Sequence, residues 1–296
     1  GYIKRIPADT YKSQQRGGRG VIGAGTRDED FIEHLFTAST HSHILFFTNK
    51  GKVHWLKVYR IPEASRQAKG TAVVNLLNLD KDEYIASYIR VNEFDDKHYL
   101  VLATRKGLVK KTNLMAYSRP RQSGIIAITL EEGDGLVNAV LTDGNRQIMI
   151  ATAKGMAVKF HESDARPIGR TSKGVRGVMI RGDDEVIGMV IADDTKTLLT
   201  VTENGYGKRT RISEYRRINR GGVGVKNIQC TERNGRAVSV RAVEDEDDVM
   251  IITRNGIIIR MQMRGVSVIG RNTQGVRLMR LAQDDKVISA AEVAKE

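Results

Sequence analysis

The sequence has 296 residues, and its 48 Lys and Arg against 35 Asp and Glu give a formal net charge of +13. This balance favours an anionic partner, either nucleic acid or an acidic membrane surface, with simple solubility as the competing explanation. The single cysteine, Cys230, excludes an internal disulfide, and no apolar run approaches the roughly 18 residues of a membrane helix, so we expect a cytoplasmic protein without a membrane partner. The first residue is Gly rather than Met, which indicates a fragment or a processed chain.

One pattern recurs along the chain: an apolar strand-like run ending in Thr, two further residues, a Gly, and a second strand-like run. In chain order the copies are 44–48 with Gly51, 100–104 with Gly107, 148–152 with Gly155, 198–202 with Gly205, and 249–253 with Gly256. Their glycines lie 56, 48, 50 and 51 residues apart. Gly1 opens the second half of a sixth copy, and the run 286–291 resembles the run that precedes each Thr-bearing strand.

Each unit contains about four short β-rich runs separated by Gly, Asn or Asp, which is typical of hairpins. A period near 50 with four strands predicts an all-β, propeller-like ring of six four-stranded antiparallel blades in one domain, 1–296. We expect the C-terminal strand to close the ring by joining the N-terminal residues, which would hide the sheet edges. The expected blades are 1–40 with 284–292, then 41–93, 94–143, 144–193, 194–244 and 245–283.

A second repeated feature is a loop of Arg, two residues, a mostly basic or amide residue, and Gly, which we call the arginine loop. These loops cover 16–20, 66–70, 170–174, 217–221 and 271–275. The first residue of each loop is Arg16, Arg66, Arg170, Arg217 or Arg271. The fourth residue is Arg19, Lys69, Lys173, Arg220 or Gln274. The remaining unit has Arg119 and Arg121 before Gly124. Gly beside Arg lets backbone N–H groups and a guanidinium approach the same phosphate, so we expect these loops to contact DNA from one rim.

The strand after each Thr-x-x-Gly turn adds a second basic set. The fourth residue past the glycine is Arg5, Lys111, Lys159, Arg209 or Arg260, with Trp55 as the exception, and Lys4, Lys52, Lys57, Lys110 and Lys208 lie nearby. We predict DNA contacts here, with ordinary solvent-facing charges as the alternative. The segment 194–244 has 11 Lys and Arg against 5 Asp and Glu, led by Arg209, Arg211, Arg216, Arg217 and Arg220, so we expect DNA to contact that blade most strongly. The acidic runs 28–30 and 244–248 should face away from it.

Aromatic residues make up only 5% of the chain and do not alternate with the arginine loops, which disfavours base stacking on single strands. Duplex backbone is therefore the expected ligand, with sequence preference set mainly by how easily the duplex bends. We expect no metal site at His41 and His43, because no further ligands stand at suitable spacing. The carboxylates Asp183 and Asp184 recur as Asp284 and Asp285, which indicates turn residues rather than catalysis.

The segment Gln14, Gln15, Arg16, Gly17, Gly18, Arg19, Gly20 resembles the heptapeptide box Gln-Arg-Arg-Gly-Gly-Lys/Arg-Gly of the DNA gyrase A family, with Gln15 in place of Arg. The stretches 204–210 and 270–276 are also similar to that family. The resemblance implies a β-pinwheel, a propeller-like disc whose rim wraps duplex DNA so that the enzyme introduces negative supercoils using ATP. The resemblance also implies that the heptapeptide box is the feature responsible for DNA wrapping.

The same resemblance implies that this chain alone is not an enzyme and holds no cofactor, because the cleavage tyrosine lies in the N-terminal part of gyrase A and the ATPase in gyrase B. ATP and Mg²⁺ belong to those parts, which are the expected protein partners of an otherwise monomeric domain. Two alternatives stay open: the counterpart domain of topoisomerase IV, and a propeller-like scaffold for an acidic protein.

Overall fold

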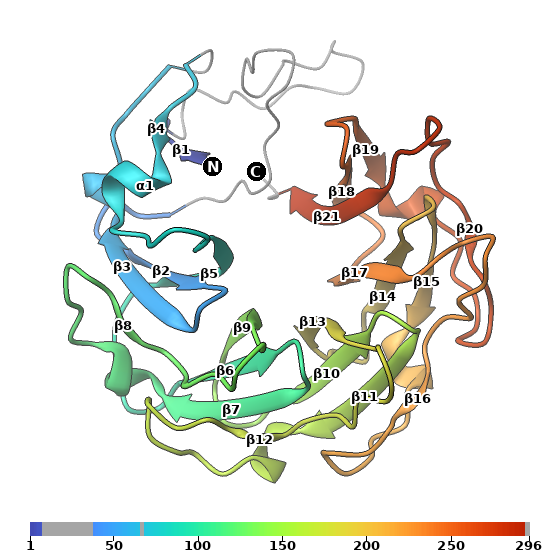
Figure 1. Ribbon diagram of the computed structural model, residues 1–296, viewed down its shortest axis with the longest axis horizontal. Helices are drawn as coiled ribbons and strands as arrows, with labels where there is room; N and C mark the ends of the chain where they lie inside the picture. The colour runs from blue at the N-terminus through green and yellow to red at the C-terminus, as the bar shows by residue number, and fades with distance from the viewer. Residues whose placement is uncertain (8–37, 66–67, 294–296) are drawn as a thin grey trace.

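The computed structural model describes residues 1–7, 38–65 and 68–293, which form a ring of small antiparallel β-sheets around a common centre (Figure 1). Residues 14–20, the acidic run 28–30 and Arg66 lie outside the described residues. Each sheet is a blade that runs from an inner strand near the centre to an outer strand at the edge, and the inner strands of successive blades adjoin one another. The prediction of an all-β, propeller-like ring is confirmed.

The blades are described from the inner to the outer strand. The first contains β5 (Ile85–Val91), β2 (His43–Thr48), β3 (Lys52–Lys57) and β8 (Ile125–Ile126). The second contains β9 (Leu136–Thr142), β6 (Tyr99–Thr104), β7 (Leu108–Asn113) and β12 (Val175–Arg176). The third contains β13 (Val186–Ile191), β10 (Gln147–Thr152), β11 (Met156–His161) and β16 (Val225–Lys226). The fourth contains β17 (Ala237–Val243), β14 (Thr197–Thr202), β15 (Tyr206–Arg211) and β20 (Val276–Arg277). The fifth contains β21 (Val287–Val293), β18 (Asp248–Thr253) and β19 (Ile258–Gln262).

The remaining elements are short. β1 (Tyr2–Ile3) pairs with β4 (Thr71–Ala72), and α1 (Val73–Leu76) is a single helical turn. A 3-10 turn follows the second hairpin strand of each blade: η2 (Val58–Arg60), η3 (Leu114–Tyr117), η4 (Glu162–Asp164), η5 (Ile212–Glu214) and η6 (Met263–Gly265).

The outer strand of a blade comes from the following unit of the chain. β8 belongs to the unit of β6 and β7 yet pairs with β3, and β12, β16 and β20 repeat this arrangement. The chain then returns to its own blade as the inner strand, so that β5 pairs with β2 and β9 with β6. Neighbouring blades are therefore joined by an exchanged strand as well as by packing.

The predicted ring of six complete blades is wrong for the described residues, which form five blades, four of them four-stranded, and the two-stranded β1–β4 sheet. Most of the predicted first blade, 1–40, falls outside the described residues. Within that range β1 is the one described strand, and it pairs with β4 of the following unit as β3 pairs with β8.

The predicted closure by the C-terminal strand is also wrong. β21 pairs with β18 from Asp248↔Val293 to Thr253↔Val287, so it is the inner strand of its own unit rather than a partner of the N-terminal residues. The register shift before Thr253 has counterparts before Thr48, Thr104, Thr152 and Thr202, which identifies β21 as the equivalent of β5, β9, β13 and β17.

The core lies between adjacent blades. Side chains alternate along each central strand, so Leu100 and Leu102 pack toward the first blade while Val101 and Ala103 pack toward the third. All four side chains are at most 1% exposed. The central strands are buried on both faces, and this fixes each blade against its neighbours.

Candidate functional site

The arginine loops lie at the outer edge of the ring, because they lead into the outer strands. The loop 170–174 precedes β12, the loop 271–275 precedes β20, and Arg119 and Arg121 precede β8 (Figure 1). The loop 217–221 lies shortly before β16. The loops 170–174 and 271–275 therefore occupy equivalent places, as expected, but the segment that matches them before β16 is 220–224 rather than 217–221. Contact of these loops with DNA stays a prediction.

Arginines of these loops are tied to the preceding outer strand at equivalent positions. Arg170 donates to the carbonyl of Ile126 in β8, Arg220 donates to that of Arg176 in β12 at 2.6 Å, and Arg271 donates to that of Lys226 in β16 at 2.9 Å. Each acceptor is the last residue of its strand. The loops therefore form a linked series along the edge.

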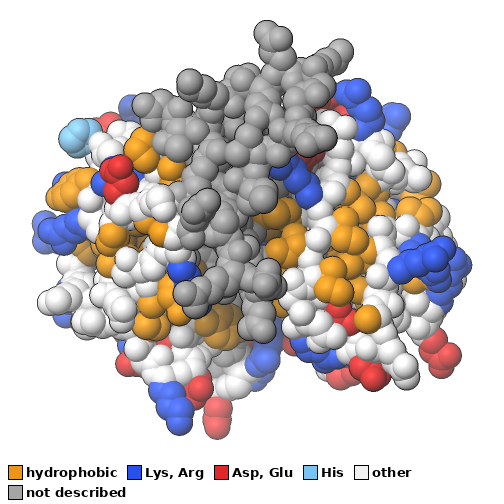
Figure 2. All heavy atoms as spheres, turned by 90° about the horizontal axis from the view of Figure 1, so that it is seen from above, with side chains coloured by type: hydrophobic (Ala, Val, Ile, Leu, Met, Phe, Trp, Pro, Cys, Tyr) orange, Lys and Arg blue, Asp and Glu red, His pale blue; other side chains and the backbone are white. Residues whose placement is uncertain are grey.

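Other members of the predicted site point into solvent. Lys69, Arg119, Arg121, Lys173, Arg211, Arg216 and Arg217 are exposed, with Arg217 3.7 Å from Asp164. Lys and Arg side chains lie in separate clusters rather than in one patch on the face shown in Figure 2.

Two predicted DNA-contact residues are buried beneath the loops. Lys110 and Lys208 are 0% exposed, so the structure contradicts a DNA contact for either. Lys110 Nζ donates to the carbonyls of Ala127 and Arg170, and Lys208 Nζ donates to those of Gly270 and Arg271, both at 2.7 Å. Both lysines hold the backbone of an arginine loop from inside.

Lys4 occupies the equivalent position, three residues after its glycine. Its Nζ donates to the carbonyls of Ser65 at 3.1 Å and Ala68 at 2.7 Å, on either side of the Arg66 position. Lys4 therefore also binds loop backbone, in contrast to the prediction of a DNA contact.

Burial lowers the pKa of the Lys110 ammonium to about 7, and the charge of Arg170 acts in the same direction. Burial also lowers the pKa of Lys208 to about 8, although Glu214 opposes the shift. A neutral amine keeps two N–H donors, so each lysine can donate to both of its carbonyl partners in either protonation state.

Most of the predicted residues four places past the glycines form ion pairs between units. Lys111 lies 3.0 Å from Glu162, Lys159 pairs with Asp194, and Arg209 lies 2.7 Å from Asp245 and donates to the Met263 carbonyl at 2.9 Å. All three basic side chains are at most 5% exposed, which contradicts a DNA contact.

The other basic residues predicted on the strands after the Thr-x-x-Gly turns also contact side chains of the protein. Arg5 lies 3.5 Å from Glu63, Lys52 lies 2.7 Å from Asp80, Arg260 donates to Asp248 at 2.8 Å, and Lys57 lies 5.7 Å from the Tyr59 ring centroid. Trp55, the exception to the basic pattern, stacks on Phe94 with ring centroids 6.2 Å apart.

The acidic run 244–248 is not simply turned to solvent. Asp245 and Asp248 pair with Arg209 and Arg260, and Glu246 accepts from Arg264 at 2.9 Å. The pair of Asp245 and Arg209 joins the fifth unit to the fourth blade, whereas the pairs of Asp248 and Glu246 lie within the fifth unit.

The interpretation of the acidic turns as structural is confirmed. Asp184 accepts the N–H of Lys154 at 2.8 Å, and Asp285 accepts that of Asn255 at 3.1 Å. In the part of the chain that the structure describes, no three His, Cys, Asp or Glu side chains gather as a metal site would require.

Cys230 is half-buried, and burial raises the pKa of its thiol.

No helix formed by the described residues has the length and apolar character needed to cross a bilayer.

Sequence reasoning missed the basic residues of the outer strands. Arg176, Lys226 and Arg277 are exposed and each follows a Gly-Val pair, a recurring Gly-Val-Arg/Lys pattern that could have identified them. Arg233 and Arg280, also exposed, stand near Arg277 and carry no repeat signal.

Comparison with known proteins assigns the family. The family model described as DNA gyrase C-terminal domain, beta-propeller, matches residues 1–39, 42–92, 98–143, 146–193, 196–244 and 247–294. The DNA gyrase A protein of Halalkalibacterium halodurans is 56% identical over 293 residues, covering 99% of this chain and 35% of that protein. The corresponding protein of Clostridium acetobutylicum is 49% identical, covering 100% of this chain and 36% of that protein. The chain thus spans about a third of the length of these relatives.

Solved structures agree with this assignment. The structure of a DNA gyrase A C-terminal domain matches with a TM-score of 0.79 and 25% identity, covering 98% of this chain and 96% of that one. The C-terminal domain of a DNA topoisomerase IV matches with a TM-score of 0.85 and 26% identity, covering 99% of this chain and 90% of that one. The six matched segments together span nearly the whole sequence, and the chain belongs to the DNA gyrase C-terminal domain family of β-propellers.

Proposed function

We propose that this chain binds duplex DNA along the outer edge of the ring and bends it with one handedness, so that a gyrase-type enzyme can introduce negative supercoils. The observation that carries the proposal is the series of arginine loops joined to successive outer strands through Arg170, Arg220 and Arg271. The regularly spaced phosphates of a DNA backbone match such a series of loops better than the single contact patch of a protein partner would.

The physical requirement is a set of many modest contacts. Bending a duplex of 20 to 30 base pairs by 40 to 90° costs of order 1 to 6 kcal/mol, and each phosphate contact offsets part of that cost. Contacts to phosphates carry no direct sequence information, so the binding is only weakly sequence-specific. Rigid loops suit this task, because a fixed arginine loses little conformational freedom when DNA binds.

The proposed partners follow from the relatives, of which this chain spans about a third. We infer that it acts in the cytoplasm beside the N-terminal part of a gyrase A protein and together with gyrase B. DNA cleavage, ATP and Mg²⁺ are assigned to those parts, while the isolated chain is a monomeric, non-catalytic wrapping domain.

The test is a ligation assay with nicked circular plasmid at low salt, after which the protein is removed and the linking number is read on a gel. A protein-dependent shift of one sign that fades as salt rises supports wrapping. The variant Arg121→Ala/Lys173→Ala/Arg217→Ala removes one exposed charge from each of three successive edge segments and should reduce the shift.

The matched control is Lys81→Ala/Arg146→Ala/Arg264→Ala, which removes three exposed charges outside the arginine loops. Equal loss of the shift in both triple variants would indicate a general charge effect. Absence of both a shift and duplex binding in the unmodified chain would contradict the proposal and favour an acidic protein partner.

The second candidate is wrapping on behalf of a topoisomerase IV, favoured by the TM-score of 0.85 to that enzyme's C-terminal domain. The gyrase assignment is preferred because the relatives of 49 to 56% identity are gyrase A proteins. Supercoiling by the complete enzyme, measured on relaxed plasmid with ATP, separates the two.

A further inference from the structure

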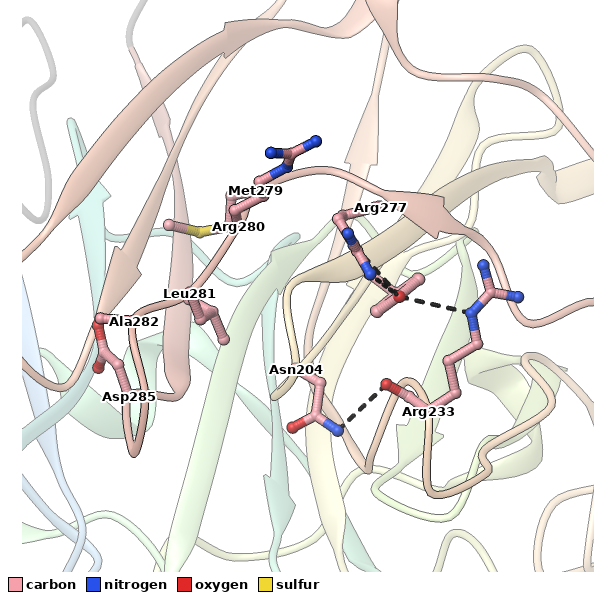
Figure 3. Close-up of a pocket in the computed structure, with 9 residues that line it drawn as sticks. Asn204, Arg233, Arg277, Met279, Arg280, Leu281, Ala282 and Asp285 are labelled. Carbon is pink, nitrogen blue, oxygen red and sulfur yellow. Dashed lines mark hydrogen bonds between the residues drawn. The ribbon is translucent and has the colours of Figure 1, made fainter.

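A pocket of about 430 Å³ lies in the fourth blade, between the β14–β15 turn, the turn before β17, and the segment that follows β20 (Figure 3). Three arginines line it: Arg233 from the turn, and Arg277 and Arg280 from the outer segment. Met279 and Leu281 supply an apolar side. None of these residues belongs to the arginine loops.

Two of the arginines converge on one phenol. Tyr206, which is 4% exposed, accepts at its Oη from Arg277 Nη2 at 2.8 Å and from Arg233 Nε at 3.4 Å. The guanidinium carbons lie 5.4 and 5.0 Å from the centroid of the same ring. Like charges are thus held together, and Figure 3 shows Arg233 and Arg277 reaching the same place from different segments.

The positive charge of this pocket is not neutralised by an ion pair within the described part of the chain. The ion pairs formed there include none of Arg233, Arg277 and Arg280. Asp285 brings a carboxylate to the pocket lining, where its Oδ1 accepts the backbone N–H groups of Asn255 and Lys286 at 3.1 and 2.8 Å and it forms no ion pair with the three arginines.

The electrostatics favour negative charge at this point. Hydrogen bonds from Arg233, and then from Arg277, lower the pKa of the Tyr206 phenol, which means that the phenolate is stabilised there. An anion carried by a ligand would gain from the same donors.

The arrangement is particular to the fourth blade. The first residue after the hairpin glycine is Tyr206 here, whereas the other described blades have Lys52, Leu108, Met156 and Ile257. The corresponding turn of the third blade has Asp183, which forms an ion pair with Lys154. Repetition of the fold therefore accounts for Arg277, which follows a Gly-Val pair as Arg176 and Lys226 do, but not for Arg233 and Arg280.

Resting on the proposed function, we propose that this pocket holds one phosphate of the DNA backbone and fixes the duplex at a single point of the fourth blade. Guanidinium groups donate paired hydrogen bonds to phosphate oxygens, and Met279 and Leu281 offer apolar contact to the adjoining deoxyribose. β20 continues directly from the arginine loop 271–275, so the pocket borders the edge along which the duplex runs.

The test measures duplex affinity by fluorescence anisotropy over a salt series with the whole chain. Arg277→Gln should weaken binding about tenfold at low salt and lower the slope of log K against log salt by about one, equally for duplexes of different sequence. Arg280→Gln removes an exposed side chain that forms no ion pair with the described residues, so it should act in the same direction without altering the thermal midpoint. Arg264→Gln, an exposed arginine of the fifth blade, is the control and should leave the slope almost unchanged.

The outcomes separate the two proposals. If the unmodified chain binds duplex and wraps it while Arg277→Gln and Arg280→Gln behave like Arg264→Gln, the pocket proposal is wrong and the proposed function stands. If the unmodified chain does not bind duplex, the proposed function fails and the pocket proposal fails with it. Competition by inorganic phosphate at millimolar concentration, without any slope change in the variants, would assign the pocket to a free anion and overturn the DNA contact.

Discussion

Lys110 and Lys208 place a basic nitrogen inside the protein, where lysine is rarely found without a partner. Their partners include the carbonyls of Arg170 and Arg271 in the arginine loops, so the side chains act on the surface from beneath it. The lowered pKa values of about 7 and 8 follow from burial. Exposed arginine and buried lysine thus have separate roles in one edge: the first is available to a ligand and the second holds the loop in place.

A pH-dependent stability follows for Lys110. The unfolded chain keeps this proton up to about pH 10.5, whereas the folded chain releases it near pH 7, so the unfolded state binds more protons between these values. The free energy of unfolding should therefore rise with pH through this window, by at most about 1.4 kcal/mol per pH unit from this group. Lys110→Met should lose that rise, as measured by urea unfolding at several pH values. Lys173→Met is the exposed control, and parallel pH curves for Lys110→Met and the unmodified chain would contradict the assignment.

Sequence reasoning could not separate these roles. Arg121 and Lys110 are both basic residues near a hairpin or a loop, and the sequence contains no sign that one is exposed and the other 0% exposed. The distinction comes from the Arg170 carbonyl, 60 residues away in the chain. A contact between residues so far apart in the chain leaves no local sequence pattern. The Gly-Val-Arg/Lys motif, in contrast, is local and could have been recognised.

The exchanged outer strand explains why a glycine ends each hairpin turn. Gly107 has a φ of +93°, and an added Cβ would lie 2.6 Å from the carbonyl oxygen of Val178, just beyond β12. The Gly107 carbonyl also accepts the N–H of Gly177 at 2.8 Å. The glycine therefore serves the attachment of the next unit as well as the turn.

Gly107→Ala should accordingly cost more than Gly256→Ala. Both positions have a positive φ, +93° and +84°, but no described atom lies within 4 Å of a Cβ at Gly256. The steric overlap at Gly107 adds about 1–3 kcal/mol to the loss of unfolding free energy. Denaturant midpoints of the two variants measure the difference, and equal losses would show that backbone conformation alone requires the glycine.

The pair of Lys111 and Glu162 joins two units through a buried contact. Glu162, with a side chain 0% exposed, also accepts from Thr142 Oγ1 at 2.7 Å and from the N–H of Arg146 at 2.7 Å. Lys111→Met leaves this carboxylate without its ammonium and should cost about 3–5 kcal/mol. The double variant with Glu162→Gln should recover part of that loss, a coupling that a double-mutant cycle in urea measures. Strict additivity of the two single losses would show that the ion pair is energetically irrelevant.

The strands that could be predicted are those with a repeated local sequence pattern. The runs ending at Thr48 and Thr253 show the hairpins clearly, because six residues of β-rich sequence precede a fixed turn. β12 has only two residues and no periodicity, so its exchange between units was not visible. The closure prediction failed because it assigned the run before a Thr-bearing strand to the unit that follows, whereas each such run pairs with the Thr-bearing strand before it in the chain, as β5 pairs with β2 and β21 with β18.

At the scale of the molecule, the described blades form a ring with spaced charge at its edge and apolar packing within. Each edge segment contributes a similar small amount, so affinity depends on their sum. Bending depends on these contacts through a threshold, because the duplex stays straight unless the total contact energy exceeds the elastic cost of bending it.

Stepwise removal of Arg121, Lys173 and Arg217 should therefore separate affinity from wrapping. The losses in log K should add across the three positions, because the residues lie in different segments of the edge. The linking-number shift should instead fall more steeply than affinity and vanish while binding persists. Anisotropy and plasmid ligation on the same variants measure the two quantities, and proportional decline of both would contradict a bending threshold.

The exchange of outer strands also sets an order of events during synthesis on the ribosome. The hairpin of β2 and β3 is made by residue 57, yet its fourth strand, β8, is made only at residues 125–126. A nascent blade therefore presents an open strand edge until most of the next unit has emerged, and that unit docks onto a surface already in place. Assembly is therefore expected to proceed from the first blade toward the last, with the open edge of each blade receiving a strand of its successor.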